Sequence, residues 1–232
     1  MPPCRRCWRI FVCRKSVTVS RAEEAAEALG FPVSRETLEQ LDRFSEALVA
    51  WSRRINLIAP NTYADVWSRH VIDSLQIVRY VPAGFPDRWC DIGSGGGLPG
   101  IVVAIVASER APETTVLLVE ADKRKSAFLK IISRELGLNT EVVTQRIETA
   151  DDVKAGIVSA RALAPMPELL GYCARHLAPG GACILAKGRN WRQELEAAQQ
   201  SWHFECDRHD SIVDRDSVVL VLRNLRRLGS LT

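Results

Sequence analysis

The stretch from Trp89 to Gly100, with the sequence WCDIGSGGGLPG, constrains the fold more than any other part of this 232-residue chain. It is typical of the end of a buried strand, a glycine-rich turn and the start of a helix, with Pro99 suited to the first helical position. The next residues, GIVVAIVA over about 100–107, are apolar almost all round and predict a buried helix. Glycines permit a sharp turn and let a ligand approach the backbone closely. The stretch therefore predicts a small ligand on this loop, against a helix N-terminus and at the carboxyl end of a strand.

Three helices are expected before this loop. Ser20-Arg21-Ala22-Glu23 is a capping-box pattern that opens a helix ending at Leu29. Ser34 caps a second helix over about 35–53, in which apolar residues recur every three or four positions. Thr62 is expected to cap a third helix over about 63–79. We interpret residues 20–82 as an N-terminal helical subdomain and residues 1–19 as a basic, disordered leader.

From residue 88 onward, strand and helix patterns alternate. Strands are expected at 88–92, 115–119, 141–144, 156–160 and 181–186, and helices at 100–107, 123–136, 165–178 and 190–200. Such alternation predicts an α/β fold with a parallel sheet and crossover helices. Two final extended segments, 203–209 and 216–222, have no helix between them and predict an antiparallel hairpin at one edge of the sheet. Residues 83–232 would form this second domain.

Charge and cysteine content limit the binding partners and the cellular compartment that we expect. The net charge is +3, but residues 1–19 hold five basic groups and residues 223–232 hold three, so the remainder carries −5. Any nucleic-acid binding must therefore come from local patches. The seven cysteines form no even framework, which is typical of a reducing compartment. Cys4-x-x-Cys7 has no partner pair, so no metal site is expected. No run is long enough to cross a membrane, and we expect a cytoplasmic protein.

Two classes of ligand fit the glycine loop. Gly95-x-Gly97-x-x-Gly100 matches the dinucleotide fingerprint. Asp91-x-Gly93-x-Gly95-x-Gly97 resembles motif I of the class I S-adenosylmethionine-dependent methyltransferases. Glu120 ends the second strand, where an acid can accept hydrogen bonds from both ribose hydroxyls of either cofactor. No tyrosine is followed by lysine four residues on, as a short-chain dehydrogenase would require.

A series of short motifs makes a family resemblance specific. In order, the chain carries Asn56-Leu57, Arg69-His70-x-x-Asp73-Ser74, the loop ending GLPG, Lys123-Arg124-x-x-x-Phe128-Leu129, Arg146-Ile147-Glu148, Ser159-Ala160-Arg161-Ala162 and Lys187-Gly188. The series resembles the RsmG family, whose older name is glucose-inhibited division protein B, over about residues 30–222. Ser94 and Gly96 stand where the family commonly has Thr and Pro.

The resemblance implies a fold, a reaction and a set of roles. The fold would be the Rossmann-like, seven-stranded, mostly parallel sheet of the class I methyltransferases. The reaction would be methylation of N7 of one guanine, position 527 in the 530-loop region, of 16S ribosomal RNA. Arg161 and Lys187 would align the reactants, with no acid or base catalyst. The cofactor-binding residues would be Asp91, Gly93, Gly95, Gly97, Leu98, Glu120, Ile147, Glu148 and Arg161.

The partner would be 16S ribosomal RNA or the small ribosomal subunit. Basic residues that follow strand ends could neutralise phosphates at the rim where substrate arrives. Together with polar residues of the motifs, the candidate RNA-binding set is Arg53, Asn56, Arg69, His70, Arg124, Lys125 and Lys187. His70 and Asp73 lie three apart on one helix face, where a half-buried structural histidine is the simpler interpretation. Guanine N7 carries a lone pair and no proton, so no general base is needed.

Two other functions stay open on the residues alone. One is an NAD(P)-linked oxidoreductase, because the glycine loop and Glu120 suit that cofactor equally. The other is a non-catalytic RNA-binding relative that keeps the fold. The sequence does not determine the oligomeric state, and we favour a monomer.

Overall fold

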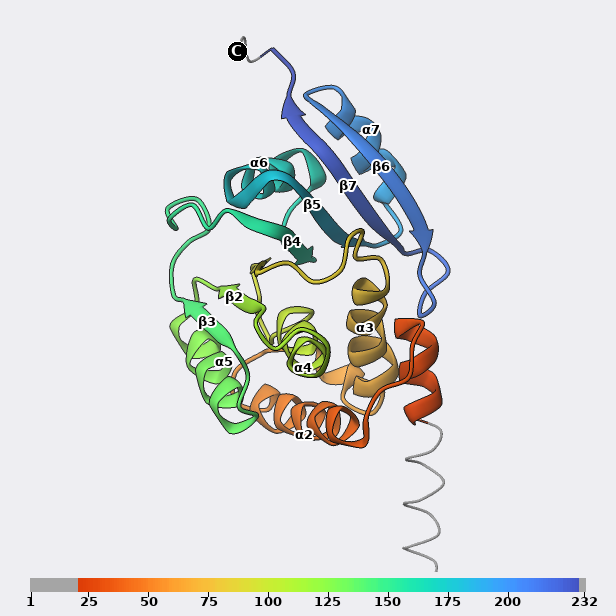
Figure 1. Cartoon of the computed structure of the whole chain (residues 1–232), viewed down its shortest axis with the longest axis vertical. Coiled ribbons are helices and arrows are strands. Elements are labelled where there is room, and N and C mark those ends of the chain that lie inside the picture. Colours follow the sequence, from red (N-terminus) through yellow and green to blue (C-terminus); the bar gives the residue numbers. More distant parts are fainter. Residues whose placement is uncertain (1–20, 230–232) are drawn as a thin grey trace, which may run out of the picture.

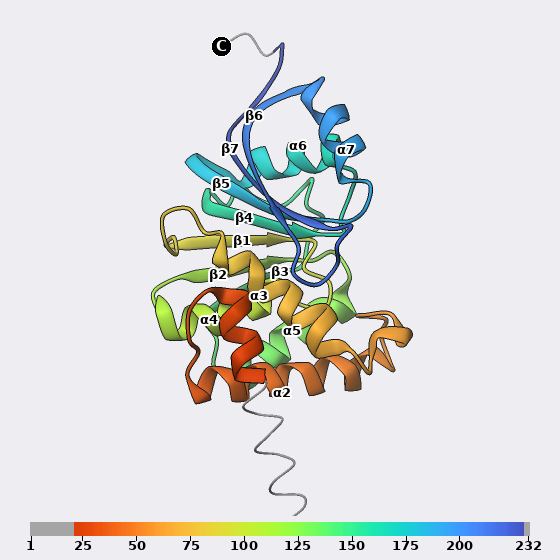
Figure 2. The same cartoon turned by 90° about the vertical axis from the view of Figure 1, so that its right-hand side faces the viewer.

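A computed structural model describes residues 21–229, so Ser20, the basic leader and the Cys4–Cys7 pair lie outside the described residues. Seven strands form one sheet in the order β3-β2-β1-β4-β5-β7-β6. Figure 2 shows β5, β4, β1 and β2 side by side in this order. β1 to β5 pair in parallel, and β7 runs antiparallel to both β5 and β6. The predicted α/β fold with an antiparallel edge hairpin is confirmed.

The strands fall close to their predicted positions. They are β1 (Arg88–Ile92), β2 (Thr115–Val119), β3 (Thr140–Val143), β4 (Ala155–Arg161), β5 (Leu177–Lys187), β6 (Trp202–Asp210) and β7 (Val218–Arg227). The helices between them are α4 (Gly100–Arg110), α5 (Lys123–Glu135), α6 (Met166–His176) and α7 (Trp191–Gln199). Pro99 stands one position earlier than expected, as the N-cap of α4. β4 is buried along most of its length and β5 over residues 182–185, which explains the continuous apolar sequences there.

The helices before the sheet agree with the prediction except for the third. A helix covers 21–29, and α2 (Arg35–Ser52) is capped by Ser34, whose Oγ accepts the Thr37 N–H at 3.1 Å. The third helix, expected over about 63–79, begins three residues late, because residues 66–79 are helical. It consists of a π-helical turn (Trp67–Val71) followed by α3 (Ile72–Arg79), and a short 3₁₀ turn (Pro60–Thr62) precedes it. Thr62 caps no helix, because its hydroxyl donates back to the Ala59 carbonyl at 2.7 Å.

Two apolar layers hold the sheet from opposite sides. The helices before β1 pack with α4 and α5 on one face, in a single cluster that includes Leu41, Phe44, Leu75 and Phe128. α6 and α7 cover the other face. Figure 1 shows α2, α3 and α4 together on one side of the strands. The N-terminal helices therefore share their core with the sheet, and their description as a separate subdomain stays a prediction.

No helix within residues 21–229 combines the length and the apolar character needed to cross a lipid bilayer. In the same range, no group of three or more His, Cys, Asp or Glu side chains is arranged to hold a metal ion. Cys90, Cys173 and Cys183 are buried and unpaired, as expected of small core residues.

Candidate functional site

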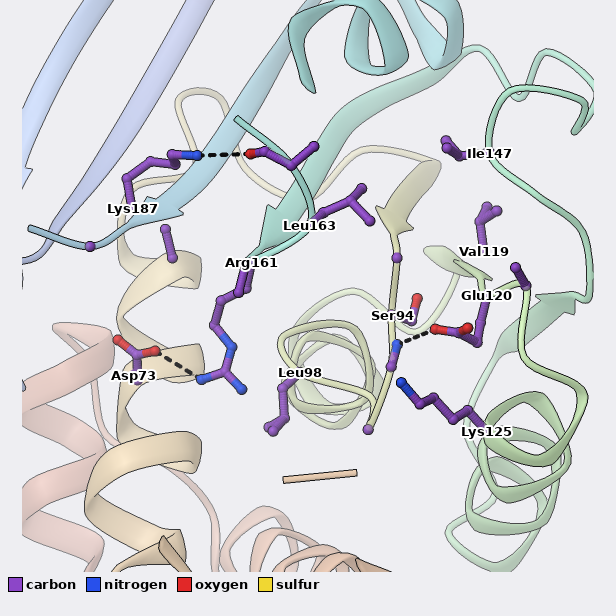
Figure 3. A pocket seen from close by; sticks show the side chains of 18 of the residues that line it. Asp73, Ser94, Leu98, Val119, Glu120, Lys125, Ile147, Arg161, Leu163 and Lys187 are labelled. Atoms are coloured by element: carbon purple, nitrogen blue, oxygen red, sulfur yellow. Dashed lines mark hydrogen bonds and ion pairs between the residues drawn. The ribbon is translucent and has the colours of Figure 1, made fainter. Parts of the chain in front are cut away.

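A hollow of about 950 Å³ opens at the carboxyl ends of β1, β2 and β4. Its lining comes from the glycine loop after β1, the end of β2, residues 145–148 after β3, the segment after β4 and the end of β5. Figure 3 shows these side chains converging from both halves of the sheet. Open parallel sheets bind ligands at this edge, where the strand order reverses around the first strand.

Asp91 shapes the glycine loop from beneath. Its carboxylate accepts the Gly100 N–H at 3.2 Å and the Ser159 hydroxyl at 2.7 Å, and its side chain is buried at 1% exposure. Burial raises the pKa of Asp91 to about 6, against the lowering effect of these hydrogen bonds. Asp91 does not line the hollow. The structure therefore gives it a part in ordering the loop, in place of the direct cofactor contact that was expected.

Gly93 brings the backbone to the wall of the hollow in a conformation that suits glycine. Its φ is +67°, and a Cβ added there would lie 2.4 Å from Leu163 Cδ1. Gly97, with φ +81°, faces the protein interior, where a Cβ would lie 2.5 Å from Ile101 Cγ1. Gly93 therefore lines the hollow, whereas Gly97 packs beneath it.

Glu120 is fixed by two backbone N–H groups. Its Oε2 accepts the Gly95 N–H at 2.8 Å, and its Oε1 accepts the Asp122 N–H at 2.7 Å. Figure 3 shows the contact to the loop. Each carboxylate oxygen has a second lone pair, so Glu120 can still accept hydrogen bonds from a vicinal diol in the hollow.

Apolar side chains line the hollow near Glu120. Val119, Ile147 and Leu98 all contribute to its wall. Glu148 follows Ile147 and accepts a hydrogen bond from the Tyr172 hydroxyl at 3.3 Å. An apolar slot next to a diol acceptor fits an adenosine, since the base packs against aliphatic groups and the ribose reaches Glu120.

Arg161, Asp73 and His70 form one hydrogen-bonded group on the opposite wall. The guanidinium of Arg161 donates to Asp73 Oδ2 at 3.0 Å and reaches His70 Nδ1 at 3.3 Å. His70 Nε2 lies 2.9 Å from the Thr62 hydroxyl. Because burial, and then the charges of Arg161 and Arg69, lower the pKa of His70 to about 4, we assign it as neutral with the proton on Nε2.

Lys187 and Glu194 form an ion pair in the same wall. Lys187 Nζ lies 2.5 Å from Glu194 Oε2 and donates to the Ala164 carbonyl at 3.1 Å, with the side chain at 8% exposure. Glu194 also accepts the Met166 N–H at 3.0 Å. Lys187 was expected to contact RNA phosphate, but these contacts leave it no exposed ammonium to offer. It reaches the hollow as a buried, paired group.

The structure brings together ten of the sixteen predicted site residues. Those that line the hollow are Gly93, Gly95, Leu98, Glu120, Ile147, Glu148, Arg161, His70, Lys125 and Lys187. Of the others, Arg69 lines an adjoining hollow of about 690 Å³. Arg53, Asn56 and Arg124 are exposed and lie in neither hollow.

Sequence reasoning missed several residues of the site. Val119 and Leu163 line the hollow beside the predicted Glu120 and Arg161, and the rule that ligands meet strand ends could have found both. Ser211 and Ser217 come from the turn of the terminal hairpin, for which the sequence carries no chemical signal.

The sheet order and the position of the hollow are those of the class I S-adenosylmethionine-dependent methyltransferase fold. Solved structures support the fold. A SAM-dependent methyltransferase from Aquifex aeolicus matches 74% of this chain and 96% of its own, with TM-score 0.53 at 12% identity. A tRNA (m1A58) methyltransferase from the same organism matches 86% and 78%, with TM-score 0.50 at 14% identity.

The sequence model of the GidB family, described as rRNA small subunit methyltransferase G, matches residues 37–219, and the chain belongs to this family. The ribosomal RNA small subunit methyltransferase G of Ruegeria sp. (strain TM1040) is 45% identical over 200 residues, covering 86% of this chain and 97% of its own length. The protein of the same name from Sinorhizobium fredii is 42% identical over 211 residues, covering 89% and 97%.

Proposed function

We propose that this protein transfers the methyl group of S-adenosyl-L-methionine to N7 of one guanine in the 530-loop region of 16S ribosomal RNA. The observation that carries the proposal is the division of one hollow into two chemically different walls. Gly93, Gly95 and Glu120 form a wall suited to an adenosine, and Arg161 with Asp73 faces it. Membership of the rRNA small subunit methyltransferase G family supports the ribosomal substrate.

The residues of the first wall fit the cofactor. Gly93 lets the backbone approach a ligand where a Cβ would collide with Leu163. Glu120 would hold the ribose, and Ile147 with Val119 would flank the adenine. When bound, S-adenosylmethionine supplies a methyl group on a positively charged sulfur, and the protein supplies binding, alignment and exclusion of water.

The state of the ionisable groups supports N7 as the methylated atom. Asp73 is paired with Arg161, Glu194 with Lys187, and the Nδ1 of His70 accepts from Arg161. These groups are engaged in pairs and are poorly placed to abstract a proton. Guanine N7 carries a lone pair and no proton, so its attack on the methyl group needs no base.

The RNA would approach over exposed basic residues around the mouth of the hollow. Lys125 lines the hollow itself, while Arg124 and Arg53 are exposed outside it. Side chains reach N7 poorly in the deep, narrow major groove of an A-form helix, so the target guanine would be presented from a loop. We propose that the protein acts as a monomer on 16S ribosomal RNA in the cytoplasm.

The two alternative functions predict different results. An NAD(P)-linked oxidoreductase is not favoured by the family match, and it would bind NAD more tightly than S-adenosylhomocysteine. A non-catalytic relative would bind the cofactor and RNA without transferring a methyl group. Calorimetry with S-adenosylhomocysteine and with NAD distinguishes the first alternative from the proposal.

The decisive experiment uses small ribosomal subunits from a strain that lacks the methyltransferase. We expect labelled methyl groups from S-adenosylmethionine to enter 16S RNA, and strand cleavage specific for 7-methylguanine to map them to a single position. Subunits that already carry the mark are the control and should accept no label. Label at another atom or position, or no label in the unmarked subunits, would refute the proposal.

A further inference from the structure

A buried glutamine next to the site is not used by the function proposed above. Gln76 lies on α3 at 0% exposure, three residues after Asp73. Its Nε2 donates to Asp73 Oδ1 at 2.8 Å and to the Ser211 hydroxyl at 3.1 Å. Its Oε1 accepts the Ile212 N–H at 3.1 Å. Both the nitrogen and the oxygen of the side-chain amide are therefore hydrogen-bonded. An apolar residue of the same size would leave three polar partners unsatisfied.

Two of these partners belong to the turn between β6 and β7. This turn, residues 211–217, is closed on itself: the Ser211 N–H donates to the Ser217 carbonyl at 3.0 Å, and the Ser211 Oγ accepts the Val213 N–H at 3.2 Å. Figure 1 shows the turn at the end of the β6–β7 hairpin lying next to α3 and the helix over residues 21–29. In the described part of the chain, the side-chain hydrogen bonds from this turn to α3 all come from Gln76.

The turn forms part of the wall of both hollows. Ser211 and Ser217 line the hollow of about 950 Å³, while Ile212, Val213 and Ser217 line the adjoining one of about 690 Å³. Asp73 and Ser217 contribute to both. Ile212 is an apolar side chain left 46% exposed at this boundary. The turn therefore stands on the side of the hollow away from Glu120, where the second substrate would enter.

The third partner connects Gln76 to Arg161. The Asp73 carboxylate is shared, with Oδ2 accepting from Arg161 at 3.0 Å and Oδ1 accepting from Gln76 at 2.8 Å. A shift of the turn would be transmitted through Gln76 to the carboxylate that orients Arg161. A neutral amide suits this position because a glutamate there would place a second negative charge against Asp73.

We infer that Gln76 is a positioning residue with two roles. It holds the 211–217 turn, which forms one wall of the pocket on the side where the nucleotide would bind. It also couples the position of this turn to the Asp73–Arg161 pair. The ligand of this wall is the splayed nucleotide of the RNA substrate, which would meet Ile212 and the two serines. The inference rests on the proposed function, since it assumes a nucleotide as the second substrate.

Replacement of Gln76 should therefore weaken the binding of RNA selectively. Without Gln76, binding of the nucleotide must also order the turn, which weakens binding by the cost of that ordering. Glu120 and Gly93 lie on the other wall, and the hydrogen bonds of Gln76 go instead to Asp73, Ser211 and Ile212. The affinity for the cofactor should therefore be preserved.

The test compares Gln76→Met with Gln40→Met. Gln40 lies on α2, where its Nε2 donates to the Leu136 carbonyl at 3.0 Å, away from both walls described here. We expect Gln76→Met to raise the KM for unmarked small subunits by about tenfold, the loss of one to two net hydrogen bonds. We expect the Kd for S-adenosylhomocysteine to change by less than about twofold. Gln40→Met should leave both constants unchanged.

A second variant guards against a merely structural effect. Ser211→Ala removes one of the two hydrogen bonds between the turn and Gln76 without changing α3, and its effect on KM should not add to that of Gln76→Met. Equal losses of cofactor affinity and RNA affinity in Gln76→Met, or an unchanged KM for RNA, would overturn the inference.

Hydrogen exchange separates failure of this inference from failure of the proposed function. Exchange at the Ile212 amide should accelerate in Gln76→Met and stay unchanged in Gln40→Met, whatever the enzyme methylates. An unchanged Ile212 amide would refute the holding role. If the wild-type protein methylates no ribosomal RNA, the proposed function fails, and so does the assignment of a nucleotide to this wall.

Discussion

Arg161 at the end of β4 donates to Asp73 on α3 across 3.0 Å, although 88 residues separate them in the chain. Both side chains are 19% exposed, so the pair is partly withdrawn from water. This contact joins the helices before the sheet to the carboxyl end of the sheet. The N-terminal helices therefore contribute directly to the wall of the site.

Replacement of Arg161 tests the alignment role. We expect Arg161→Ala to lower kcat/KM for methyl transfer by about 100-fold, because a displaced reactant costs this much even when the chemistry is untouched. Arg88→Ala is the matched control. It removes an exposed ion pair, with Glu141 at 3.6 Å, at the other end of the sheet and should leave the rate unchanged. Normal turnover in folded Arg161→Ala would contradict the assignment.

The glycine loop is tested at Gly93. Gly93→Ala should weaken binding of S-adenosylhomocysteine by at least about tenfold, since the new Cβ must displace Leu163 from the wall and carries about 1–3 kcal/mol of backbone strain. Gly137→Ala has the same sign of φ, +65°, with no atom within 4 Å of the added Cβ. Calorimetry should show the affinity loss only in Gly93→Ala; equal affinities in both variants would remove Gly93 from the cofactor site.

Lys187 and Lys125 should respond differently to replacement. Lys187→Met leaves Glu194 without its cation, so we expect a loss of about 2 kcal/mol of unfolding free energy and an unchanged salt dependence of RNA binding. Lys125→Met should leave stability unchanged and reduce the slope of log affinity against log salt by about one, as loss of a phosphate contact does. Denaturant titration and binding at several salt concentrations measure both. A reduced salt slope in Lys187→Met would restore Lys187 as a phosphate ligand.

His70 predicts a pH dependence of stability. Its pKa is about 4 in the folded protein and about 6.5 in the unfolded chain, so the unfolded chain binds more protons between these values. The stabilising contribution is complete above pH 6.5 and is lost as the pH falls toward 4. Asp91 acts in the opposite direction, because its folded pKa of about 6 exceeds its ordinary 3.8.

The difference between wild type and a His70→Gln variant isolates the histidine, since Asp91 is present in both. We expect the stability advantage of wild type to shrink between pH 6.5 and 4. The exposed His203→Gln on β6 should show no such trend. An advantage that stays constant with pH would show that His70 titrates normally.

The sequence predicts the strands well because each one carries its own local signal. β1 and β2 match their expected bounds, because the glycine loop marks the end of β1 and β2 is an almost continuous apolar run. The helix expected over 63–79 begins late and lacks its expected cap, because the Thr62 hydroxyl donates to the Ala59 carbonyl and also contacts His70.

The residues of the site likewise differ in whether a local sequence pattern predicts them. Gly93 and Glu120 follow from a strand–turn–helix pattern, which specifies their position at the sheet edge. Gln76 and Ser211 are separated by 135 residues, and only the folded chain brings them together. The burial of Lys187 was not predicted, because a lysine after a strand is usually exposed and this burial depends on Glu194 from the next helix.

The backbone contacts of Glu120 bear on how the catalytic cycle ends. Because the Gly95 and Asp122 amides already hold both oxygens, this wall needs no rearrangement to accept an adenosine. The methyl donor and the demethylated product carry the same adenosine, so this half of the pocket makes the same contacts with both. Release of the spent product is then not assisted from this side, and accumulated product should compete with fresh donor for the enzyme.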